Sequence, residues 1–142
     1  RQLVAALVPP GQRAGGDALL EEAIAVLGAP ALADLFAPGT LPEVAVTADL
    51  PGLGRIHGQV DRLIVREDAV IAVDFKTNRS VPPTPETVPD GLLRQMGAYT
   101  AALMQVWPGR RVDAALVWTV SATRMDLPAK LLRAALRRAG GA

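Results

Sequence analysis

Two acidic residues and a lysine are spaced so that a simple hairpin would bring them together. Asp61 lies in a β-rich run over 56–65, and Asp74 and Lys76 lie in the next such run, over 70–77. If the two runs form an antiparallel hairpin in which Asp61 pairs with Asp74, and Gln59 with Lys76, the paired residues share a face. Lys76 is two residues beyond Asp74 and points to the same face. We therefore expect two carboxylates and an ammonium to converge on one patch.

Such a patch has a specific chemical use. Two close carboxylates repel each other unless a cation lies between them, and a hard oxygen site of this kind suits Mg²⁺. The simpler alternative is a solvated charge pair or a salt bridge, because short D-x-K motifs are common. The 70–77 run weakens that alternative, because it is apolar on both faces and reads as a buried strand. Burying two acids and a lysine is costly without a compensating role.

A second pair of polar residues lies on a predicted helix over 91–107. Gln95 and Tyr99 are four residues apart and so share one helix face. Near the edge of a sheet they could contact a phosphate or a lysine. Alternatively, Tyr99 is an ordinary half-buried aromatic residue and Gln95 a surface residue.

Composition limits the classes of function. The chain has 142 residues, of which 50% are hydrophobic and 20% charged, as expected for one globular domain over 1–142. The net charge of +1 gives no overall signal of nucleic-acid binding. The absence of cysteine excludes disulfides, Cys-ligated zinc and a Cys-bound iron–sulfur cluster. With no apolar run long enough to span a bilayer, we expect no membrane partner and a cytoplasmic location.

The remaining elements surround the hairpin. The pattern predicts three sequential strands, a crossover helix, a further strand and a final helix, which together make a mixed α/β (α+β) sheet flanked by helices. We interpret 1–40 as a helical lead-in, with residues 1–8 as the tail of a helix, and 41–142 as the core of a domain from a larger protein. The predicted elements are a helix over 17–27 capped by Asp17, a short helix over 31–36, strands over 43–50, 56–65, 70–77 and 113–120, a loop over 80–90, and helices over 91–107 and 129–139.

Three motifs together resemble a known family. They are Gly58-x-Val60-Asp61-Arg62, Asp74-x-Lys76-Thr77-Asn78 and Gln95-x-x-x-Tyr99. They are similar to the RecB-type nucleases of the PD-(D/E)xK superfamily. Two segments, Val73-Asp74-Phe75-Lys76-Thr77-Asn78-Arg79 and Ala115-Leu116-Val117-Trp118-Thr119, resemble in particular the C-terminal nuclease domains of AddA subunits of bacterial AddAB helicase–nucleases. The resemblance covers about residues 30 to 135 and implies a restriction-endonuclease-like core.

The resemblance implies roles for individual residues. Asp61, Asp74 and the backbone carbonyl of Phe75 would bind Mg²⁺, with Mn²⁺ as a substitute. Lys76 would orient the attacking water or stabilise developing charge. Gln95 and Tyr99 would position the DNA backbone and support the site.

The resemblance also implies a setting in DNA repair and recombination. It implies cleavage of DNA single strands or ends with little sequence preference, by a domain fused to an ATP-binding UvrD-type helicase and paired with an AddB-like subunit. The location would be the bacterial cytoplasm, on the nucleoid when bound to DNA.

One departure from the family concerns histidine. The family uses a histidine on a helix upstream of the sheet, whereas the single histidine here, His57, lies four residues before Asp61. We interpret His57 as structural or close to DNA, and we expect the upstream helix to be missing, which could leave the fragment inactive. Glu43 is either an accessory acid or a solvated residue at a strand edge.

Two alternatives to this function stay open. A nuclease-like fold could bind DNA or a partner subunit without catalysis, although such a module has no need of two close acids. A stand-alone RecB-family exonuclease of the Cas4 type is the other, and the absence of cysteine counts against it because that group resembles iron–sulfur proteins.

Overall fold

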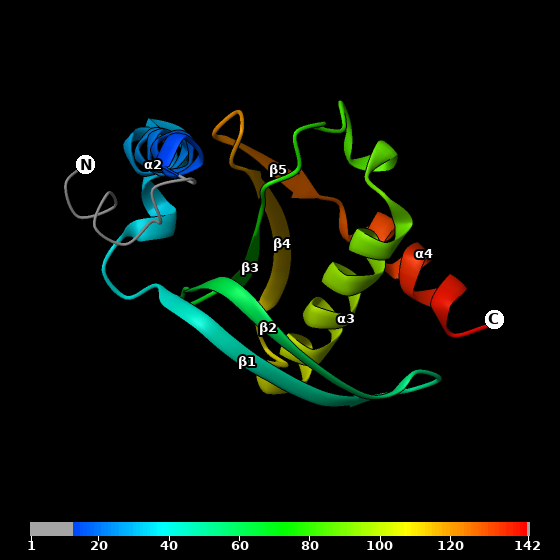
Figure 1. Ribbon diagram of the computed structural model, residues 1–142. Helices are drawn as coiled ribbons and strands as arrows, with labels where there is room; N and C mark the ends of the chain where they lie inside the picture. The colour runs from blue at the N-terminus through cyan, green and yellow to red at the C-terminus, as the bar shows by residue number, and fades with distance from the viewer. Residues whose placement is uncertain (1–12, 142) are drawn as a thin grey trace.

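The computed structural model describes residues 13–141, which form a sheet with helices on both faces (Figure 1). This α/β arrangement confirms the predicted fold class. The elements in chain order are α2 (Arg13–Gly28), the 3-10 helix η2 (Pro30–Phe36), β1 (Leu41–Leu50), β2 (Gly54–Val65), β3 (Ala69–Lys76), the 3-10 turn η3 (Pro85–Thr87), α3 (Asp90–Val106), β4 (Arg111–Trp118), β5 (Thr123–Leu127) and α4 (Ala129–Ala139).

The sheet follows the chain order β1-β2-β3-β4-β5. All neighbouring strands are antiparallel except β3 and β4, which are parallel and are joined through α3. The β2–β3 ladder runs from Arg62↔Val73 to Val65↔Val70 and has the predicted register. Among the described residues, no helix is long and apolar enough to cross a membrane.

Each face of the sheet has its own apolar core. The larger core lies between the sheet and α3, with α4 packed on the outer side of α3 (Figure 1). There Val70 and Ala72 of β3 are fully buried. The smaller core lies on the opposite face, where Ile71 and Val73 of β3 meet residues of η2 and α2. Because successive residues of a strand point to opposite faces, β3 is apolar on both sides, as its sequence predicts.

Several element predictions need correction. Strand β5 was not predicted from the sequence, because the turn before it contains no glycine or proline. Ala122 makes this turn in a left-handed conformation (φ +49°). The prediction that Asp17 caps the first helix is wrong, because α2 already begins at Arg13. The predicted loop over 80–90 contains η3. The helix tail proposed for 1–8 lies outside the described residues.

Along β2, residues that face α3 alternate with residues that face the other side of the sheet. This alternation shifts by one residue at Asp61. Before it, Gly58 and Val60 face α3, whereas after it Leu63 does. Opposite Asp61 in the β1–β2 register, Glu43 has a φ of +51°, and the pairing is interrupted there. A local break of this kind bends a strand and re-aims its side chains. Asp61 therefore lies at the bend of β2.

Candidate active site

The site lies where β2 and β3 separate. The last backbone pair of their ladder is Arg62↔Val73, and Asp61 and Asp74 come directly after it. Contrary to the sequence prediction, neither Asp61 with Asp74 nor Gln59 with Lys76 is a ladder pair. The shift in the alternation along β2 explains that correction. Beyond the ladder, the backbone N–H of Phe75 donates to Oδ2 of Asp61 at 2.8 Å. The Asp61 side chain thus replaces the missing backbone partner and ties the two strand ends together.

Asp74 and Lys76 lie together on the face that α3 covers. Asp74 is 5% exposed. The Nζ of Lys76 lies 2.7 Å from Oδ2 of Asp74, and the lysine side chain is 16% exposed. The expected convergence of these two side chains with Asp61 is therefore present in the fold.

The Asp74 carboxyl affects the ionisation of Asp61. Burial and a hydrogen bond with the Asp74 carboxyl raise the pKa of Asp61 from 3.8 to about 6, against the Phe75 N–H and the Lys76 charge, which lower it. This is the behaviour of two acids that share one site. Two carboxylates face one ammonium there, so the cluster carries one acid in excess.

A chain of polar contacts continues onto α3. Lys76 Nζ donates to Oε1 of Gln95 at 3.3 Å, and Nε2 of Gln95 donates to the Tyr99 hydroxyl at 3.2 Å. Gln95 is exposed, whereas Tyr99 is 7% exposed. A Cβ at Gly58 would lie 2.7 Å from the Tyr99 hydroxyl oxygen. Gly58 therefore leaves the space that the tyrosine ring fills.

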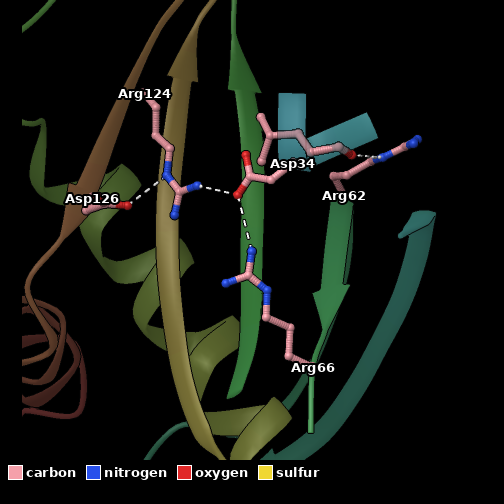
Figure 2. A network of polar contacts seen from close by, with 6 residues as sticks. Asp34, Arg62, Arg66, Arg124 and Asp126 are labelled. Atoms are coloured by element: carbon pink, nitrogen blue, oxygen red, sulfur yellow. Dashed lines mark hydrogen bonds and ion pairs between the residues drawn. The ribbon is translucent and has the colours of Figure 1, made fainter. Parts of the chain in front are cut away.

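On the opposite face of the sheet, residues of η2 brace the same ends of β2 and β3. This brace was not predicted from the sequence. Arg62 Nε donates to the backbone carbonyl of Leu35 in η2 at 2.7 Å, a contact visible in Figure 2. The Arg62 guanidinium lies 5.3 Å from the centre of the Phe36 ring, which stacks on the Phe75 ring at 6.2 Å with an interplanar angle of 6°. Phe36 thus links the residue after Asp61 to the residue after Asp74. No local sequence motif indicates this brace, because the residues that form it lie far apart in sequence.

A second charged network lies on this opposite face, beside the brace. Figure 2 shows Arg66 and Arg124 both reaching Oδ2 of Asp34, at 3.4 and 3.2 Å. Arg124 also contacts Asp126 at 2.9 Å. Two carboxylates meet two guanidiniums, so this network is balanced in charge and anchors η2 to the sheet.

Other residues singled out from the sequence lie outside the cluster. His57 is exposed on β2 and its Nδ1 lies 3.2 Å from Oγ1 of Thr47. Glu43 is exposed. Arg79, which follows the Asp74 motif, and Arg94, which precedes Gln95, form ion pairs with Glu22 and Asp90.

The donor set fits a divalent cation. Within residues 13–141 no group of three or more His, Cys, Asp or Glu side chains could hold a metal ion, so any site here is built on a carboxylate pair. Mg²⁺ keeps several waters and uses one or two protein carboxylates, which matches that pair. A bound cation would also offset the excess acid and favour the ionised form of Asp61.

Comparison with known families gives one result. The model of the PD-(D/E)XK nuclease superfamily matches residues 5–138, almost the whole chain. No curated protein matches. Nucleases of this superfamily generally use divalent metal ions and act on DNA. Polar contacts connect five of the motif residues, Asp61, Asp74, Lys76, Gln95 and Tyr99, at the β2–β3 opening and on α3. The chain belongs to the PD-(D/E)XK nuclease superfamily.

Proposed function

We propose that this domain hydrolyses DNA phosphodiester bonds in a reaction that depends on Mg²⁺, with Mn²⁺ as a substitute. The observation that supports this most is the excess carboxylate at the β2–β3 opening. Asp61 and Asp74 share that opening with a single ammonium, and the pKa of Asp61 is raised to about 6. A site kept in this unbalanced state is suited to a cation that arrives with the substrate or before it.

The proposed ligands are Asp61, Asp74 and the backbone carbonyl of Phe75. When bound, the metal ion supplies a water of lowered pKa and positive charge for the scissile phosphate. The Phe75 N–H binds Oδ2 of Asp61, and a bound cation would take the place of the proton in the hydrogen bond between Asp61 and Asp74. The hydrogen bond from the Phe75 N–H fixes the Phe75 peptide and hence the direction of its carbonyl.

Lys76 acts on the reacting groups. Its ammonium is held by Asp74 and Gln95, so it is already oriented before substrate binds. From there it orients the attacking water or stabilises negative charge that develops on the phosphate. Gln95 contacts the DNA backbone, and Tyr99 holds Gln95 through its hydroxyl.

The closer similarity of the motifs supports a more specific setting. We propose that the chain is the nuclease domain of an AddA-type subunit, with 1–40 as the lead-in and 41–142 as the catalytic core. It would act on DNA single strands or ends with little sequence preference, next to a UvrD-type helicase motor that binds ATP and an AddB-like subunit. Its location would be the cytoplasm, on the nucleoid during DNA repair and recombination.

The experiment is cleavage of linear DNA by the purified protein with Mg²⁺ or Mn²⁺. We expect cleavage by the wild type and none by Asp74→Asn. The matched control is Asp34→Asn, which removes a carboxylate from the balanced network and should cost about 1 kcal/mol of stability without loss of cleavage. Cleavage by Asp74→Asn at the wild-type rate would contradict the proposal.

If the wild-type domain does not cleave DNA, a second assay tests the proposal. The same assay is then run on the full-length protein as the cell makes it, because the family that the motifs resemble uses a histidine on a helix upstream of the sheet. Cleavage by the full-length protein, lost again with Asp74→Asn, supports the proposal, and its inactivity contradicts it.

A further inference from the structure

Helix α4 presents a row of basic side chains that form no ion pair or hydrogen bond with any residue that the structure describes. Lys130, Arg133 and Arg137 are exposed and follow one another at spacings of three and four residues, which places them along one helix face. The opposite face of α4 is buried through Leu132 and Ala135. No acidic residue occurs in α4.

This row differs from the other basic residues of the molecule. Among the basic side chains whose positions the structure describes, most are neutralised or hydrogen-bonded; Arg55, for example, pairs with Asp49 at 2.9 Å. Arg138, also on α4, pairs with Asp90 at 2.6 Å. Among the basic side chains of residues 16–141, those without an ion pair or hydrogen bond are Arg110, Lys130, Arg133 and Arg137.

The row costs the helix stability. Arg133 and Arg137 are like charges four residues apart, which is unfavourable on a helix surface. Lys130 lies in the first turn, where the helix dipole disfavours a cation. A chain that pairs nearly all of its other described cations and leaves these three together is suited to bind a polyanion here.

Two residues of the row border a groove at the end of the β1–β2 hairpin whose second strand continues to Asp61. Arg133 and Arg137 line a groove of about 340 Å³ together with the β1–β2 turn (50–53) and Ala101 of α3. From this groove β2 runs from Gly54 to Asp61, a length of about 23 Å at strand rise. That length corresponds to about seven nucleotides at the rise of B-form DNA.

We infer that Lys130, Arg133 and Arg137 form a phosphate-binding surface that holds DNA on the way to or from the site. We call these three residues the α4 stripe. The surface binds the sugar–phosphate backbone through charge and reads no base. The inference rests on the proposed function for the identity of the polyanion as the nuclease substrate.

The test is a binding titration of a fluorescent 20-nucleotide single strand, in EDTA, at several salt concentrations. The variant is Lys130→Gln/Arg133→Gln/Arg137→Gln, which keeps good helix formers at all three positions. Loss of three phosphate contacts should make the slope of log K against log[salt] shallower by about 2 and lower the affinity about 10²-fold at about 0.1 M salt. The single variant Arg137→Gln should change the slope by about 0.7, and it provides the test if the triple variant fails to fold.

A matched control separates the stripe from net charge. Arg55→Gln/Arg66→Gln/Arg111→Gln removes the same total charge from cations that already have acidic partners. Its affinity should fall about threefold or less, because distant surface charges are screened. Equal losses in the two triple variants would overturn the inference. So would polyglutamate competing as well as the DNA, since the stripe would then fit an acidic protein.

The binding titration tests the α4 stripe and the cleavage assay tests the proposed function, so a negative result in one does not decide the other. Binding in EDTA requires no catalysis, so an inactive domain can still bind DNA through the stripe. An active domain whose binding ignores the stripe would refute the inference and leave the proposed function intact.

Discussion

The two faces of the sheet each carry a cluster of charges, and the clusters are built differently. On the η2 face, Asp34 and Asp126 meet Arg66 and Arg124, so each acid has a cation. On the α3 face, Asp61 and Asp74 share Lys76, although Asp74 is only 5% exposed. The more deeply buried acidic pair is therefore the less neutralised one.

This difference teaches how to separate a structural charge cluster from a functional one. A balanced, half-exposed network costs little and anchors one element to another. An unbalanced pair is expensive, because two carboxylates share one ammonium in a buried site and the pKa of Asp61 is raised there. The imbalance, more than the presence of charge, marks the α3 face as the site.

The largest effect should come from the lysine at the unbalanced cluster. Lys76→Ala should lower the single-turnover cleavage rate by about 10²–10³-fold, because it removes one preorganised group aimed at developing charge. DNA affinity should change little, since many phosphate contacts share it. Lys76→Arg should recover little activity, because a planar fork replaces a compact ammonium. A near-normal cleavage rate for Lys76→Ala at saturating enzyme would show that Lys76 forms an ordinary salt bridge and has no role in catalysis.

The next effect tests the brace that links the two faces. Phe36→Leu keeps an apolar side chain but loses the flat stack on Phe75 and the contact with Arg62. We expect the affinity for Mn²⁺ to fall about 10-fold, at the lower end of what loss of a ligand-orienting contact costs. Isothermal titration calorimetry measures it. Arg124→Lys, which perturbs only the balanced network, is the control, and an equal loss there would argue against a specific brace.

The smallest effect concerns pH. In the folded protein Asp61 holds its proton up to pH about 6, whereas an aspartate in the unfolded chain loses it near 3.8. Between these values unfolding releases a proton, so the free energy of unfolding of the metal-free protein should fall as pH rises from about 4 to about 6 and then level off. Asp61→Asn should remove this component of the pH dependence. Denaturant titrations across that range would show it, and identical profiles for both proteins would contradict the assignment.

The sequence predicted the parts of the fold that depend on local patterns. The β2–β3 register followed from two β-rich runs, and α3 followed from its helical pattern and the Pro108-Gly109 stop. The sequence did not predict that the ladder ends before Asp61, because the shift in the alternation along β2 involves Glu43 on another strand.

The candidate site was predictable to a similar extent. The motifs indicated which side chains meet, and Gly58 was noted in its motif without the reason for it. That reason is the Tyr99 ring, which comes from an element far along the chain. The Phe36–Phe75 stack and the Arg62–Leu35 hydrogen bond are also long-range contacts without periodicity, so nothing in a single sequence points to them.

The most direct test of the central claim is thermal unfolding in a Mn²⁺ titration. An ion that binds only the folded site raises the melting temperature with concentration. The account predicts that rise for the wild type and for Asp34→Asn, and none for Asp74→Asn, whose metal-free stability should be close to or above that of the wild type. If Mn²⁺ stabilises Asp74→Asn as much as the wild type, the unbalanced acids at the β2–β3 opening are not the metal site.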